Sequence, residues 1–223
     1  GRPPRYVGRV TEDARTTETR RRLIDATMET IRVQGIATVS ARTIAATGGV
    51  NQALIFYHFG NVSTLIGEAC LASVNDRVAT FGPRLDVVTT FAGLVDAAVV
   101  LHREERELGN VNVLAQVLAG SQSNPELAEV TGRALRVWTD KVEEVLSRLL
   151  AASPIGEAFD AKTLANLVSS TFIGLELMGS TAAGGSDSDV AGLERLGVLA
   201  ELLDDLGPIA RRAVRATLRK HSG

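Results

Sequence analysis

The fold is decided by residues 40–59, which read Ser-Ala-Arg-Thr-Ile-Ala-Ala-Thr-Gly-Gly-Val-Asn-Gln-Ala-Leu-Ile-Phe-Tyr-His-Phe. Ser40 is a residue type that caps helix N-termini, and the helix it starts is expected to end near Thr47. The pair Gly48-Gly49 supplies a tight turn, after which Asn51 can cap a second short helix. Two short helices joined in this way form a helix-turn-helix, whose second helix enters the major groove of DNA.

The second short helix is expected to have an inner and an outer side. Val50, Ile55 and Phe59 are spaced to pack inward against Ile44 and the helix before it. The other positions carry amides, a leucine, a phenol and an imidazole, and helix N-termini add N–H groups for phosphates. The predicted DNA-binding residues are Ser40, Arg42, Asn51, Gln52, Leu54, Tyr57, His58 and Asn61.

Most of these residue types have a natural partner on DNA. The amides of Asn51 and Gln52 can bond adenine bidentately in the major groove, and Leu54 can meet a thymine methyl group. Tyr57 and His58 suit phosphate oxygens, which fix the register of a protein on the duplex. The alternative is a polar helix that only covers the surface of a bundle. The capped helix and the double glycine before it favour DNA.

The charge distribution agrees with this interpretation. The whole chain has a formal net charge of -2, but residues 1–62 hold nine arginines against five acidic residues, an excess of four positive charges. The remaining residues hold 15 Lys and Arg against 21 acidic residues, an excess of six negative charges. A basic front end joined to an acidic body is what attraction to phosphates predicts.

The composition indicates a globular protein made of helices. Hydrophobic residues make up 45% of the 223 residues and aromatic residues only 4%, with abundant Ala, Leu, Val and Arg. The single cysteine, Cys70, excludes an intramolecular disulfide and fits a reducing cytoplasm. The N-terminus lacks a signal-like apolar run, and the longest charge-free apolar stretch, residues 163–175, is too short to span a bilayer.

The sequence predicts an all-α fold of nine or ten helices and shows no strand pattern or internal repeat. Caps are expected at Asn61, Asn124 and Asp160, and breaks at Gly35 and at Gly82-Pro83. Residues 1–15, rich in Gly, Pro and Arg, are expected to be a flexible arm. Helices are expected at about 17–34, 40–47, 51–59, from Asn61 to Gly82-Pro83, 85–105, 107–119, 124–150, 160–178, 190–206 and from 208 to the end.

Residues 20–71 resemble the N-terminal domain of the tetracycline-repressor (TetR) family of bacterial regulators. The resemblance is carried by a first helix ending at Gly35, Ile44-Ala45, Gly49-Val50, Tyr57-His58-Phe59 and Leu65. Two positions depart from the family pattern, and each departure is expected to remove one phosphate contact. Val62 stands where the family usually has lysine, and Phe56 where it often has tyrosine. The residues expected to compensate are Arg2, Arg5 and Arg9, which arms of this kind can insert into a minor groove.

The resemblance implies three parts: a basic arm (1–15), a helix-turn-helix DNA-binding domain (16–62) and a helical ligand-binding and dimerisation domain (63–223). It implies a homodimer formed through the last two long helices, here 163–178 and 190–206. Polar or aromatic side chains within apolar helices suit a ligand cavity, although each also fits an ordinary structural role. The predicted ligand-binding residues are His102, Gln116, Trp138, Phe172 and Glu176.

The expected function is that of a ligand-responsive repressor, which binds a palindromic operator as a homodimer and is released by a small-molecule inducer. The sequence carries no glycine-rich phosphate loop, nucleophile elbow or metal-spaced His/Cys group, so neither enzyme activity nor a cofactor or metal is expected. One alternative is a helical small-molecule-binding protein or enzyme that has lost DNA reading, which Phe56 and Val62 favour. Another is an obligate partner-binding subunit.

Overall fold

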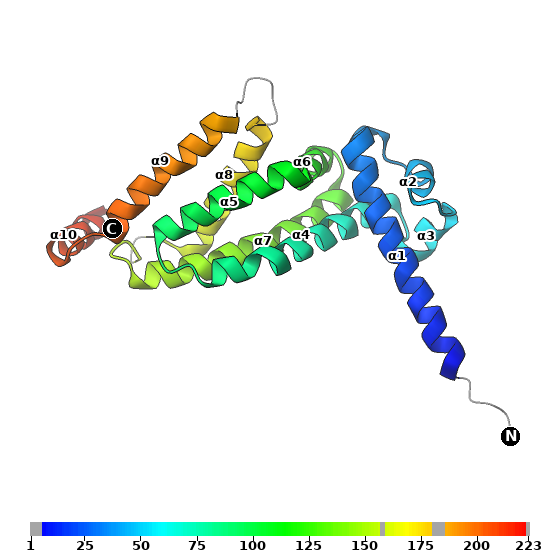
Figure 1. The fold of residues 1–223 in the computed structure, drawn as a ribbon, viewed down its shortest axis with the longest axis horizontal. Coiled ribbons are helices and arrows are strands. Elements are labelled where there is room, and N and C mark those ends of the chain that lie inside the picture. Colours follow the sequence, from blue (N-terminus) through cyan, green and yellow to red (C-terminus); the bar gives the residue numbers. More distant parts are fainter. Residues whose placement is uncertain (1–5, 157–158, 180–185, 222–223) are drawn as a thin grey trace. The chain divides into compact units, whose positions relative to one another are not determined.

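The structure, a computed structural model, describes the backbone of residues 6–156, 159–179 and 186–221. Within these ranges it describes the side chains except at 6–13, 111, 176–179, 186–189, 215 and 218–221. All regular structure in this part is helical, as the composition predicts (Figure 1). The elements are α1 (Tyr6–Gln34), the 3-10 turn η1 (Ile36–Thr38), α2 (Ala41–Gly48), α3 (Ala53–Phe59), α4 (Val62–Asp86), α5 (Phe91–Leu108), α6 (Asn110–Ser121), α7 (Pro125–Ala152), α8 (Ala161–Gly179), α9 (Ser186–Asp204) and α10 (Pro208–His221).

The chain divides into two compact units. The first comprises the chain up to Ser73 and the later segment Gln116–Ala134, and the second comprises Val74–Ala115 and the chain from Leu135 onward. The divisions fall inside α4, α6 and α7. The first unit thus contains the helix-turn-helix and a segment far along the chain.

The helix α1 is longer than expected. It begins at Tyr6, whereas the sequence predicted a flexible arm up to residue 15 and a helix start near Thr17. The prediction relied on apolar periodicity, which a helix needs only where it is packed. Once the buried half around Leu23 is helical, extending the helix through polar residues costs little free energy. The ion pair between Arg21 and Glu18 also stabilises the helix. Residues 1–5 lie outside the described part.

The Gly82-Pro83 pair does not end α4, which contains Pro83 and continues to Asp86. Phe81 and Leu85 flank the proline and are buried in the core of the second unit, so their burial offsets the lost backbone hydrogen bond. The Arg148 guanidinium donates to the backbone oxygens of Leu85 and Asp86 at 3.1 and 3.2 Å. The predicted helix start at Leu85 is therefore wrong.

Three other helices start at side-chain caps. Thr90 caps α5, where its side chain accepts from the Gly93 N–H. The caps expected at Asn124 and Asp160 are present, with side-chain oxygens that accept from the N–H groups of Leu127 and Thr163. Short polar side chains followed by helix-forming residues thus set these ends locally.

In the second unit, α9 packs along α5 and also contacts α8. The Asp204 carboxylate, at the end of α9, accepts from the N–H groups of Phe91 and Ala92 in the first turn of α5. The core between α4, α5, α7 and α8 is apolar, with Trp138 and Phe172 at its edge. Among the described helices, none is long and apolar enough to cross a bilayer.

Candidate nucleic-acid interface

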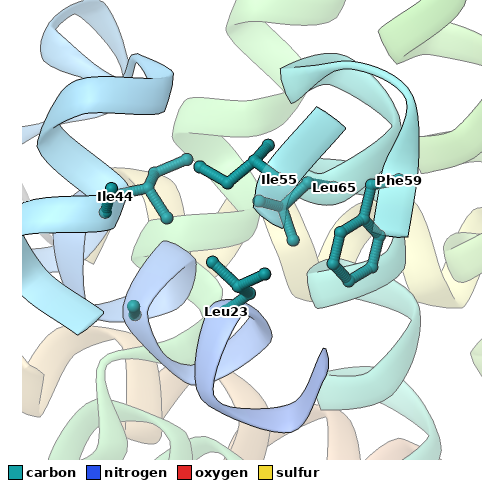
Figure 2. Packing of buried hydrophobic residues seen from close by; sticks show 7 residues of the cluster. Leu23, Ile44, Ile55, Phe59 and Leu65 are labelled. Atoms are coloured by element: carbon teal, nitrogen blue, oxygen red, sulfur yellow. The ribbon is translucent and has the colours of Figure 1, made fainter. Parts of the chain in front are cut away.

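The helix-turn-helix is held by one apolar cluster. Its labelled members in Figure 2 come from four helices and converge on one point: Leu23 of α1, Ile44 of α2, Ile55 and Phe59 of α3, and Leu65 of α4. All five are buried, and four are completely inaccessible. Val50 packs against this cluster from the turn. The predicted inward set of Val50, Ile55 and Phe59 is therefore confirmed.

The turn between α2 and α3 has the geometry that glycine allows. Gly49 lies in the left-handed region with φ 60° and ψ 39°, a conformation that costs other residues free energy. The next residue, Val50, donates its N–H to the Ala45 oxygen at 3.0 Å and so closes the end of α2. At the other end, Ser40 and Thr43 form a reciprocal capping box.

The outer side of α3 is open to solvent. Asn51, Gln52 and Phe56 are exposed, and the Tyr57 side chain is 79% exposed. Ser40 and Arg42, at the start of α2, are exposed as well. A helix of this kind, anchored on its inner side and bare on its outer side, can enter a groove without unpacking the core.

The two asparagines among the predicted DNA contacts have bonds within the protein. The Asn51 Oδ1 accepts from the Ala53 N–H at 2.8 Å, which leaves its Nδ2 as a donor. The Asn61 Oδ1 caps α4 by accepting from Thr64 at 2.7 Å, and its Nδ2 donates to Glu126 at 2.6 Å. Asn61 therefore serves as a cap fixed to a carboxylate, a role that competes with a phosphate contact.

Leu54 and His58 are partly buried. Leu54 packs against the apolar cluster, so much of its side chain is unavailable to a thymine methyl group. The His58 ring lies edge-on to Tyr57, with centroids 4.8 Å apart. Partial burial lowers the pKa of His58 below its ordinary value of 6.5, and the nearby charge of Arg20 lowers it further. Near neutral pH this imidazole is mainly uncharged, so it would act on phosphate as a hydrogen-bond donor.

Two arginines of α1 contact the helix-turn-helix in a way that the sequence did not predict. The Arg20 guanidinium donates to the His58 backbone oxygen at 2.7 Å and lies over the Phe59 ring at 4.3 Å. The Arg22 guanidinium donates to the Gly48 backbone oxygen at 2.9 Å. The sequence signal that precedes these contacts is the run of arginines directly before the buried Leu23.

Of the predicted ligand-binding residues, His102, Trp138 and Phe172 lie in the second unit. His102 is fully buried in the second unit, where its ring meets that of Phe172 edge-on at 6.5 Å. Trp138 is half-buried beside the same core. Gln116 belongs to the first unit, where its Oε1 accepts from the Ile36 N–H at 2.9 Å. The side chain of Glu176 lies outside the described residues.

The interior of the second unit also contains polar groups that the sequence analysis did not single out. The Ser169 hydroxyl on α8 is buried and has no hydrogen-bond partner among the described residues. Arg77 of α4, largely buried, pairs with Glu104 and Glu105 of α5 at 2.6 and 2.5 Å. Buried charges need such pairing, which makes this ion cluster a structural link between α4 and α5.

Comparison with known proteins identifies the helix-turn-helix. The family described as TetR_N, bacterial regulatory proteins, tetR family, matches residues 23–69. An uncharacterised HTH-type transcriptional regulator of Mycobacterium tuberculosis is 23% identical over 158 residues, which cover 71% of this chain and 79% of that protein.

Solved structures share the fold. A structure from Rhodococcus sp. assigned to the TetR family of transcriptional regulators has a TM-score of 0.69 at 17% identity, over 82% of this chain and 98% of that one. The Bacillus subtilis regulator FadR, solved in complex with stearoyl-CoA, has a TM-score of 0.66 at 17% identity, over 83% of this chain and 98% of that one. Residues 23–69 therefore match the N-terminal domain of the tetR family of bacterial regulatory proteins, and the all-helical fold is similar to that of solved transcriptional regulators.

Proposed function

We propose that this regulator is a repressor, which binds a palindromic operator as a homodimer and releases it when a small-molecule inducer binds. The observation that carries the proposal is the bare outer side of α3, where Gln52 and Tyr57 are exposed while Ile55 and Phe59 anchor the inner side. A protein that reads DNA works beside the chromosome, so in a bacterium we expect it in the cytoplasm.

The proposed DNA contacts have different roles. Gln52 is the main base reader, since its amide is exposed and makes no cap hydrogen bond. Tyr57, Arg42 and Ser40 are the proposed phosphate contacts, with His58 as an uncharged donor beside them. Asn51 donates through its Nδ2 while its oxygen holds the start of α3. Leu54 and Asn61 contribute mainly by packing and capping.

The homodimer is supported by an apolar face on α8 and α9, which we call the α8/α9 face. It comprises Leu167, Leu196, Val198, Leu199 and Leu202, each at least half exposed in the single chain. Large apolar residues gathered on neighbouring helices indicate an interaction surface. Pairing two copies through this face would present two recognition helices to the two half-sites of a palindrome.

The inducer site is proposed inside the second unit, near His102, Trp138 and Phe172. The Ser169 hydroxyl adds a buried polar group in the same unit. An apolar lining with a few orienting polar groups is typical of small-molecule sites. The inducer can release DNA only if it binds one arrangement of the dimer more tightly than the other.

The proposal is tested by gel shift with the DNA upstream of the gene and a shuffled duplex of equal length, at several salt concentrations. We expect tighter binding to the upstream DNA and an affinity that falls steeply with salt as counterions are released. Equal affinity for both duplexes would reject a sequence-reading regulator. No DNA binding, with retained affinity for a small molecule, would favour the alternative of a helical ligand-binding protein or enzyme.

A further inference from the structure

The recognition helix α3 has little intrinsic support. It has only seven residues, Gln52 at its N-cap makes no side-chain hydrogen bond, and Gly60 ends it with φ 80°. Isolated helices of this length are unstable in water. The orientation of α3 must therefore come from contacts with other elements.

Arg20 of α1 supplies such contacts at the C-terminal end of α3. Its guanidinium donates to the His58 backbone oxygen at 2.7 Å, one of the carbonyls that a helix end leaves without an internal partner. A cation at this end also interacts favourably with the helix dipole. The same group lies over the Phe59 ring at 4.3 Å and reaches Glu68 of α4 at 3.9 Å.

These contacts hold the Arg20 side chain against the protein. Its side chain is 38% exposed, whereas that of the neighbouring Arg21 is 67% exposed and, among the described residues, pairs with Glu18 of its own helix alone. The two arginines carry the same charge, lie one residue apart and differ in what they touch. Arg21 is thus a matched control for Arg20.

We infer that Arg20 is a positioning residue for DNA recognition: it fixes the C-terminal end of α3 through His58 and Phe59 and so sets the angle at which Gln52 and Tyr57 meet the duplex. The inference rests on the proposed function, since it assumes that α3 reads DNA. It assigns Arg20 no phosphate contact, in contrast to the general role that a basic N-terminal region would suggest.

The test compares Arg20→Gln, Arg20→Lys and Arg21→Gln for binding to upstream and shuffled DNA across a salt series. We expect Arg20→Gln to weaken binding to upstream DNA about tenfold, as for one lost charge-assisted hydrogen bond. Binding to shuffled DNA and the salt slope should change little, because no phosphate contact is lost. Arg20→Lys, which keeps one donor and the charge, should recover part of the affinity, and Arg21→Gln should behave like the wild type.

A second measurement checks that Arg20 lies beside His58 in the folded protein. The pKa of His58, followed by NMR on the free protein, should rise in Arg20→Gln because the nearby positive charge is gone, and should stay unchanged in Arg21→Gln. A salt slope that falls by about one would mean that Arg20 contacts phosphate and would overturn the inference. Wild-type affinity in Arg20→Gln would also overturn it. If the wild type itself does not prefer its upstream DNA, the proposed function fails first and the inference with it.

Discussion

Neighbouring amides at the start of α3 illustrate how backbone geometry divides similar residues between roles. Asn51 accepts a backbone N–H through its Oδ1, whereas Gln52 makes no cap hydrogen bond and is exposed. The short Asn51 side chain accepts a hydrogen bond from the backbone of its own helix, whereas the longer Gln52 side chain makes no such bond. This difference makes Asn51 the better cap and Gln52 the better base reader.

At the residue scale, His58 is expected to make stability depend on pH. Its pKa lies below the ordinary value of 6.5 in the folded protein, mainly because of partial burial. The unfolded chain therefore binds a proton at higher pH than the folded chain, and the free energy of unfolding falls as pH drops below about 6.5. In His58→Gln this contribution is absent.

Urea denaturation of the wild type and of His58→Gln, between about pH 7.5 and about pH 5, checks this expectation. The difference between the two curves isolates His58, since both proteins keep every other titrating group. We expect the wild type to lose more stability than the variant on acidification. Parallel curves would show that the environment of His58 is not as described.

At the scale of elements, α4 and α7 pack closely within the first unit at Gly67, a position that requires glycine. A Cβ added to Gly67 would overlap the Val130 side chain. We expect Gly67→Ala to lower the free energy of unfolding by about 1–3 kcal/mol through overpacking. The double variant Gly67→Ala/Val130→Ala should be less destabilised than the sum of the two single variants, because the overlap is relieved.

Chemical denaturation of the three variants gives this coupling energy directly. Additive losses would mean that Gly67 and Val130 do not touch in the folded protein. The polar contacts of Asn61 with Glu126 and of Asn124 with Ser63 connect the same two helices, so the packing is not an isolated contact.

The sequence predicted those elements whose ends are decided locally. Gly35 and Gly49 have positive φ and end their helices as expected, and the caps at Ser40, Asn61, Asn124 and Asp160 are present. The start of α1 was wrong because the helix extends through polar residues that show no apolar periodicity, and the start of α5 was wrong because the burial of Phe81 and Leu85 carries α4 past Pro83. The contacts of Arg20 and Arg22 could not be predicted, since their partners lie 38 and 26 residues away in sequence.

At the scale of the whole molecule, the α8/α9 face should hold two copies together. Leu199 and Leu202 are both 63% exposed in the single chain. We expect Leu199→Glu/Leu202→Glu to shift sedimentation from dimer to monomer, since burying two carboxylates in an apolar interface is costly. Val87→Glu, an exposed apolar position outside α8 and α9, is the control and should leave the dimer intact.

Loss of the dimer should also weaken operator binding, because a monomer engages only one half-site at a time. A wild-type protein that sediments as a monomer would remove the basis for a palindromic operator. Dissociation caused equally by Val87→Glu would indicate that the paired surface lies elsewhere.

Whether α3 reads DNA through Gln52 is shown by the preference of Gln52→Ala for upstream over shuffled DNA. We expect this preference to fall by roughly tenfold or more, the discrimination that one bidentate amide contact provides. The free energy of unfolding should stay within about 0.5 kcal/mol of the wild type, as for an exposed side chain. A folded Gln52→Ala protein that keeps the full wild-type preference would show that Gln52 does not read the bases.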